Sequence, residues 1–266
     1  MIEWLNNSSI LIRKLRGDRL KIHVLQVKLY TTFFFKVALA NKLNFLYTLL
    51  IPAVLLSLQL YSQRSNDEGV SHSIIYSWLA YMVINHALTH TFAVSFLREQ
   101  GYLKQYHTVV TSVYIFLISE ALVGLFKLLA STLMLLILVS FLTPLSITQL
   151  AIVSFIAIVL TYPALVLLFS FFLRFKINRH TISTIQNAAT MILIAALILT
   201  QAFLSNELTL LLNIINPLNL IMSTFYSVQL ISLSDLLLTV VPILILYIAI
   251  GIFSLKHIEI LPSEGH

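Results

Sequence analysis

Residues 128–142 read LLASTLMLLILVSFL. The run is apolar apart from small hydroxyl side chains, and no charged residue interrupts it. A transmembrane β-strand would need about ten residues that alternate between apolar and polar side chains, and this run does not alternate. An α-helix is the other structure that satisfies every backbone polar group within lipid. Extended back to Val113, the segment exceeds the roughly 20 residues that a helix needs to cross a bilayer.

The composition of the whole chain agrees with this segment. Its 266 residues are 59% hydrophobic and 10% charged, with a mean hydropathy of +0.96. Soluble domains carry about 25% charged residues, so lipid rather than water must surround most of this chain. The chain contains no cysteine, which excludes disulfides, thiolate metal sites and a cysteine nucleophile. The sequence therefore predicts an all-α, multi-pass membrane protein.

Apolar segments separated by polar breaks divide the chain into spans. We predict six transmembrane helices, over residues 43–62, 73–97, 113–142, 149–173, 182–204 and 236–255. Residues 205–234 are apolar but are broken by Asn213, Asn216, Pro217 and Asn219. Such a segment is typical of short re-entrant or interfacial helices, and a seventh span is the alternative.

Basic residues set the orientation of these spans. Fourteen of the sixteen lie in the N-terminal arm, the turn after the second span, the loop 174–180 and the C-terminal tail. The intervening loops carry only Arg64, and Lys127 lies within a span. Because cytoplasmic loops are enriched in Lys and Arg, the asymmetry predicts six spans with both termini in the cytoplasm. The net charge of +6 is thereby assigned to a membrane surface and not to nucleic acid.

Four regions follow from this organisation. Residues 1–23 form a basic cytoplasmic arm, and residues 24–41 mix Lys28 and Lys36 with three phenylalanines. That mixture favours an amphipathic helix lying in the membrane interface. Residues 42–256 form the six-helix domain, and 257–266 form a cytoplasmic tail.

Motifs for chemistry within this chain are missing. The sequence contains no GxxxxGK[ST] phosphate loop, no HExxH and no GxSxG, each of which marks a known type of catalytic or nucleotide site. We expect no catalytic residue, no metal and no cofactor of its own, and conclude that the chain alone is not an enzyme.

Polar side chains inside the predicted spans are the candidates for a substrate path, because a polar group facing lipid is costly. His86 and His90 are four residues apart and share one helix face, so they form a polar stripe together with Asn85 and Thr89. Two histidines can also ligate a metal or a haem iron, but they do not complete a zinc site.

Glu120 and Lys127 share a face of the third span. They are separated by ~10 Å along the helix axis, too far for direct contact. In one interpretation Glu120 is interfacial and Lys127 snorkels or pairs with another helix. In the other, Lys127 faces a hydrated cavity and meets an anionic substrate or Glu120.

The turn between the second and third spans lies in the stretch SFLREQGYLKQYHTVVTS, residues 95–112. Its core, REQGYLK at 98–104, resembles the stretch after the second helix of ABC-2 type permeases. Further landmarks of that family are similar in order: LLIPAVLL at 49–56, SFFLRFKINRHTISTIQNAATM at 170–191 and INPLNLIMSTF at 215–225. The sequence departs from the family where Ser119 and Glu120 replace a frequent Gly-Lys, and where Tyr102 replaces a threonine.

The resemblance implies a permease of the ABC-2, or type V exporter-like, fold. Two permease subunits, identical or paralogous, would each bind a separate ATP-binding subunit that holds ATP and magnesium. The turn would then be the coupling element that contacts this ATPase. The resemblance assigns that role to Arg98, Glu99, Gly101, Tyr102, Leu103 and Lys104, with Tyr102 and Leu103 as packing residues and the charged residues at the rim. The other interpretation of the turn is an ordinary solvated loop.

The expected function is export of an amphipathic or hydrophobic substrate, such as a drug, an antimicrobial peptide or a lipid-like molecule, across a bacterial cytoplasmic membrane. A permease for polysaccharide or teichoic acid is the related alternative. An ion-coupled secondary transporter is a different class and would need acidic groups within the membrane. An intramembrane enzyme lacks its catalytic residues here, and nothing specific supports a membrane scaffold.

Overall fold

The structure is a computed structural model. It describes residues 19–40, 42–65, 72–99, 113–175 and 216–256, together with several positions between 181 and 195. These parts are helical and contain no strand. The elements are α2 (Arg19–Ala40), α3 (Lys42–Ser65), α4 (His72–Glu99), α6 (Val113–Leu142), α7 (Ile147–Phe169), η1 (Ser170–Arg174), α10 (Pro217–Gln229), α11 (Leu233–Asp235), η3 (Leu236–Val240) and α12 (Val241–Leu255).

Three helical segments among the described residues are long and apolar enough to cross a membrane. They are Tyr114–Leu142, Ile147–Arg174 and Leu233–Leu255, with lengths of 29, 28 and 23 residues. They correspond to the third, fourth and last predicted spans. The all-helical class and the membrane character are therefore confirmed, whereas the count of six spans stays a prediction.

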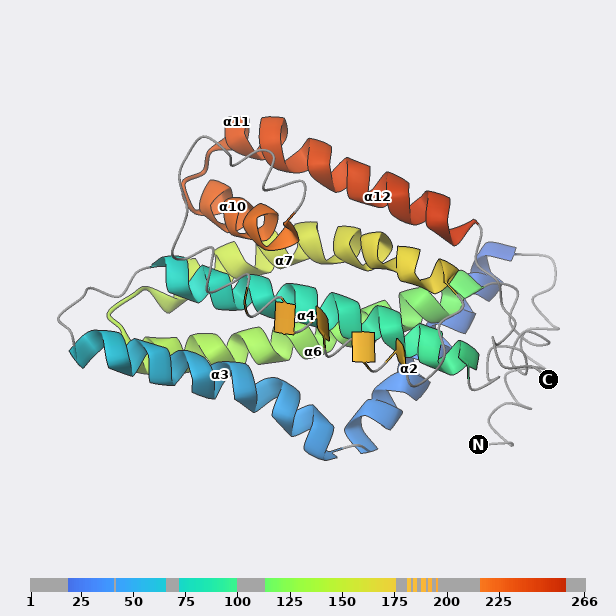
Figure 1. The fold of residues 1–266 in the computed structure, drawn as a ribbon, viewed down its shortest axis with the longest axis horizontal. Coiled ribbons are helices and arrows are strands. Elements are labelled where there is room, and N and C mark those ends of the chain that lie inside the picture. Colours follow the sequence, from blue (N-terminus) through green and yellow to red (C-terminus); the bar gives the residue numbers. More distant parts are fainter. Residues whose placement is uncertain are drawn as a thin grey trace.

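Helix α4 differs from these three because it is central. It contacts α3, α6, α7, α10 and η1, and most of its side chains are buried by them. In Figure 1 it runs through the middle of the elongated bundle. A helix that is surrounded by protein can carry polar side chains that would be costly against lipid. This position explains why α4 contains more polar residues than α6, α7 or α12.

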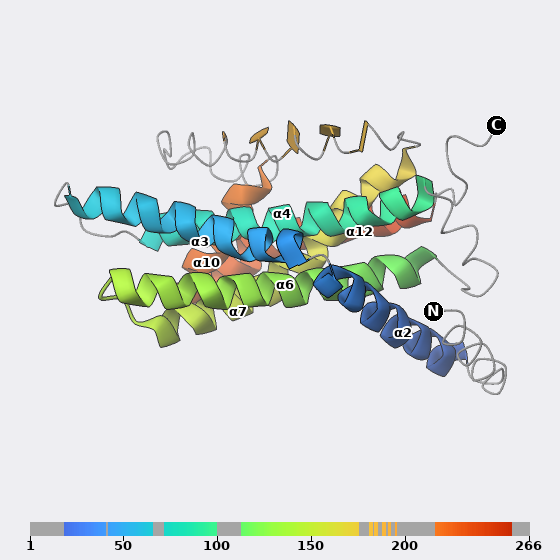
Figure 2. The same ribbon diagram turned by 90° about the horizontal axis from the view of Figure 1, so that it is seen from below.

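Helix α2 packs against the first half of α6 at an oblique angle (Figure 2). Tyr30 and Phe34 are buried there, and the ring of Phe116 lies 4.9 Å from that of Tyr30. Val24 and Val37 remain exposed, so α2 keeps an uncovered apolar surface. The helix begins at Arg19, earlier than the predicted residue 24. Its placement in the membrane interface stays a prediction.

The segment around the Asn-Pro pair forms a short helix, as predicted. Asn216 is the N-cap of α10, and its side-chain oxygen accepts a hydrogen bond of 3.0 Å from the backbone N–H of Leu218. Pro217 occupies the first turn, where its missing N–H is no loss. Helix α10 packs on α4 and α7. Residues 205–215 lie outside the described residues. The re-entrant arrangement and the alternative seventh span both stay predictions.

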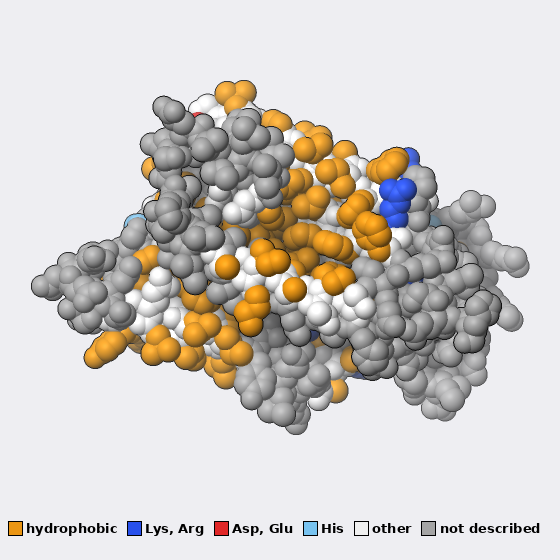
Figure 3. Space-filling view, viewed as in Figure 1, with side chains coloured by type: hydrophobic (Ala, Val, Ile, Leu, Met, Phe, Trp, Pro, Cys, Tyr) orange, Lys and Arg blue, Asp and Glu red, His pale blue; other side chains and the backbone are white. Residues whose placement is uncertain are grey.

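Four helix ends lie close to one another at the same end of the bundle. The first residue of α2, the last residue of α4, the first of α6 and the last of α12 all lie at one end of the long axis (Figures 1 and 2). The described part of the face in Figure 3 is largely hydrophobic, and Lys and Arg side chains gather there where α12 ends. We call this end of the bundle the basic end.

Candidate functional site

Three helices enclose a group of polar side chains in the interior of the bundle. Helix α4 contributes His86 and His90, α6 contributes Glu120 and α7 contributes Tyr162, and none of the four is more than 8% exposed. We call these four residues the buried polar cluster. Sequence analysis predicts three of its members, and the structure shows that they meet.

The centre of the cluster is a contact between a histidine of α4 and a carboxylate of α6. The Nδ1 atom of His90 lies 2.9 Å from the Oε2 atom of Glu120. When Glu120 is ionised it can only accept, so Nδ1 of His90 then carries the shared hydrogen. The pair therefore links the two helices in the interior of the bundle.

Gly124 makes the space that the cluster occupies. It lies one turn after Glu120, on the same face of α6. A Cβ atom at this position would overlap the imidazole of His90 and the hydroxyl of Tyr162. The Tyr162 hydroxyl instead approaches the α6 backbone and donates to the carbonyl oxygen of Ala121 at 3.1 Å. A glycine here permits this close approach of α4 and α7 to α6.

His86 and Lys127 extend the cluster along the helix axes. The rings of His86 and His90 are stacked, with centroids 6.3 Å apart and planes inclined by 8°. Half-buried Lys127 interacts electrostatically with His86 and with Glu120. Within the described part of the chain, however, no carboxylate lies within 4.0 Å of its ammonium group. Glu120 is thus buried with His90, whereas its depth relative to the membrane boundary stays a prediction.

Asn85 and Thr89 are less enclosed than the histidines. Both are only partly buried on α4, since each lies about 100° around the helix from the histidine that follows it in the sequence. Their membership of a substrate path stays a prediction. The described residues contain no group of three or more His, Cys, Asp or Glu side chains that could hold a metal ion, so nothing in this part of the chain supports the metal alternative.

Arg98 occupies a second buried polar site, at the basic end. Its side chain is 1% exposed. The guanidinium donates to the carbonyl oxygens of Leu173 at 2.6 Å and Phe175 at 2.7 Å. Carbonyls at the end of a helical segment have no partner within the helix, and a fixed guanidinium fork can satisfy two of them. Arg98 therefore joins the end of α4 to the end of η1, which differs from the expected exposed rim charge.

The rest of the predicted coupling element is not covered by the structure. Glu99 is the last residue of α4. Gly101, Tyr102, Leu103 and Lys104 lie outside the described residues, as do residues 1–18 and the tail 257–266. Their assigned contacts with an ATPase stay predictions.

Two residues of the site are not predicted from the sequence. Gly124 and Tyr162 lie in apolar runs that look like ordinary membrane helix, and no motif distinguishes them. Their importance arises only where α4, α6 and α7 approach each other. An isolated glycine within a helix is a weak signal of close packing, and it is the only signal that points to Gly124.

Comparisons with known proteins do not identify a relative. Searches of protein-family models, of curated proteins and of solved structures found no match. The resemblance to ABC-2 permeases consequently rests on the motifs of this sequence.

Proposed function

We propose that this chain is the permease subunit of an ABC exporter. It would work in a bacterial cytoplasmic membrane as six spans with both termini inside, paired with a second permease subunit. A separate ATP-binding subunit would hydrolyse ATP. The order of the motifs in the sequence supports this proposal, and the apolar helical bundle is compatible with it.

The observation that carries the proposal is the way α4 and α6 are joined. The two helices flank residues 100–112, and α4 ends where α6 begins, at the basic end. The His90–Glu120 pair links them in the interior, and Arg98 links α4 to η1. A movement of the turn would therefore be transmitted to α4, α6 and the end of α7. A partner that binds ATP shifts a two-state bundle by its differential affinity for the two states, and these contacts would carry that shift into the helices.

A second candidate is proton-coupled transport by the chain itself. It is favoured by one observation, the buried pair of His90 and Glu120 with His86 and Lys127 nearby. Ionisable groups within a membrane helix often mark a proton or ion path. The two candidates use the same cluster differently, as a mechanical link in the first and as a proton carrier in the second.

The deciding experiment is purification of this chain together with the product of a neighbouring reading frame that carries a GxxxxGK[ST] phosphate loop, followed by reconstitution in liposomes. We expect the two subunits to co-purify and the export of a fluorescent amphiphile to require ATP. The double variant Tyr102→Ala with Leu103→Ala should retain ATP hydrolysis and lose export, because the turn no longer fits its partner.

The matched control is Ala130→Val, an exposed position on α6 at which export should not change. If export occurs without ATP and a protonophore abolishes it, the proposal of an ABC exporter is rejected and proton-coupled transport is favoured. Normal export by the turn variant would reject the coupling role.

A further inference from the structure

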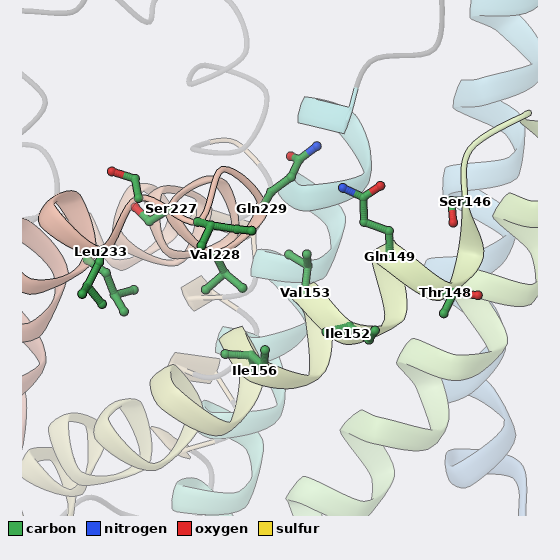
Figure 4. Close-up of a pocket in the computed structure, with 13 residues that line it drawn as sticks. Ser146, Thr148, Gln149, Ile152, Val153, Ile156, Ser227, Val228, Gln229 and Leu233 are labelled. Atoms are coloured by element: carbon green, nitrogen blue, oxygen red, sulfur yellow. The ribbon is translucent and has the colours of Figure 1, made fainter.

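A cavity of about 680 Å³ lies apart from the buried polar cluster, between the beginning of α7 and the end of α10 with the turn to α11 (Figure 4). We call it the α7–α10 pocket. These elements lie at the opposite end of the bundle from the basic end (Figure 1). The volume is within the range of about 300–1,000 Å³ that is typical of small-molecule sites.

The floor of the pocket is apolar because of helix periodicity. Gln149, Ile152, Val153 and Ile156 all line it, and their spacing of three, four and seven residues places them on one face of α7. Val228 of α10 completes this apolar surface from the other side (Figure 4). An apolar body of a ligand could therefore lie along about two turns of α7.

Two carboxamides, those of Gln149 and Gln229, and the hydroxyls of Ser146, Thr148, Ser227 and Ser232 are the polar groups of the lining. The carboxamides of Gln149 and Gln229 lie on the same side in Figure 4, away from Ile156. Gln229 is held in place, because its Oε1 atom accepts a hydrogen bond of 2.9 Å from the hydroxyl of Tyr76. Its amide N–H groups remain as donors. None of the residues that line the pocket is ionisable.

The turn after α10 forms the outer wall. Ile231 has a positive φ of 55°, a backbone conformation that β-branched residues rarely adopt. Two hydrogen bonds of Ser232 hold the turn: its N–H donates to the carbonyl oxygen of Ser227 at 3.0 Å, and its hydroxyl donates to Asp235 at 2.6 Å. Ile152, Ile231 and Leu233 line the pocket and are also exposed, so its apolar wall continues onto the exposed apolar surface of the bundle.

We propose that the α7–α10 pocket binds one neutral amphiphile that enters sideways from the surrounding lipid. Its apolar chain lies against α7, and its hydrogen-bonding head meets the carboxamides of Gln149 and Gln229. An ionised head is disfavoured, because a buried charge without a partner is costly and the lining offers none. The placement of this site in the outer leaflet, where an exporter would release its substrate, rests on the proposed function. The binding itself does not.

The test uses the full chain in phosphatidylcholine nanodiscs with a monoacylglycerol that carries a photoreactive diazirine in its acyl chain. After illumination, peptide mass spectrometry should find the label in residues 149–156 and 227–236. Excess unlabelled monoacylglycerol should displace it. A fatty acid with the same diazirine, ionised at neutral pH, should label these residues about tenfold less.

Two variants and a control distinguish a binding site from ordinary lipid contact. Ile156→Trp fills the pocket and should reduce labelling about tenfold, and Gln149→Leu should reduce it by removing a partner of the head. Val159→Trp adds the same side chain on an exposed part of α7 outside the pocket and should not reduce it.

Two outcomes would overturn the proposal by showing contact with bulk lipid only. In one, no competitor displaces the label; in the other, the three variants are labelled to the same extent as the original chain. The experiment needs no ATPase. Labelling as expected by a chain that fails to export would leave the pocket standing and reject only the proposed function.

Discussion

The imidazole of His90 and the carboxylate of Glu120 lie 2.9 Å apart and connect α4 with α6 inside a bundle that is otherwise mostly apolar. The two residues are 30 positions apart in the sequence. Each is costly to bury alone, and together they satisfy one another. This mutual dependence gives the pair a distinctive response to mutation.

Removing either partner should destabilise the chain far more than removing both. Glu120→Leu or His90→Leu leaves the other group buried without its partner, and we expect a loss of about 3 kcal/mol in the free energy of unfolding. The double variant should recover to within about 1 kcal/mol of the original chain, since an apolar pair can replace a buried ion pair. Unfolding in mixed detergent micelles measures all three. Additive losses in the double variant would show that the two groups do not interact.

Gly124→Ala should destabilise the contact between α4, α6 and α7. Alanine favours a helix by about 1 kcal/mol over glycine, but its Cβ would overlap His90 and Tyr162. Overpacking typically costs about 1–3 kcal/mol, so the net change should be a lower melting temperature. Ala130→Gly, at an exposed position of the same helix, measures the propensity term alone. A stabilised Gly124→Ala variant would contradict the close approach.

Arg98→Gln should loosen the end of η1. The change removes charge-assisted hydrogen bonds to Leu173 and Phe175, each worth about 1.5–3 kcal/mol. Hydrogen exchange in residues 170–175 should become faster. Arg98→Lys should rescue exchange only in part, because an ammonium cannot reproduce the guanidinium fork. Lys256→Gln, which changes an exposed residue at the same end, is the control for charge. Unchanged exchange in Arg98→Gln would mean that the two hydrogen bonds do not hold this segment.

Lys127→Leu separates the two interpretations of this lysine. If Lys127 faces a hydrated path, the variant should be expressed and folded normally but should export at a reduced rate, because its interaction with Glu120 and with any anionic group is lost. Export by reconstituted liposomes is the measurement, with melting temperature as the control for folding. An unchanged export rate would favour a lysine that only extends its charge toward the membrane surface.

Local features of the sequence predict most of the helices. The third span is expected at residues 113–142, and α6 has these bounds. The break at Pro144 and the start of α10 at Pro217 are also local, since proline lacks a backbone donor and fixes φ. Such features depend on neighbours along the chain, so a single sequence carries them. The boundary of α2 is the least well predicted, because residues 19–23 are helical although they are basic.

Only the tertiary structure decides which polar groups meet. The periodicity of a helix places His86 with His90, and Glu120 with Lys127, on shared faces. It does not set the rotation of one helix against another. Packing places Glu120 against His90, with room supplied by Gly124, and buries Arg98 at the end of η1. The sequence alone determines that this is a helical membrane protein with costly polar groups inside. Contacts between helices decide their partners, because a buried polar group needs a hydrogen-bond partner and that partner lies on a neighbouring helix.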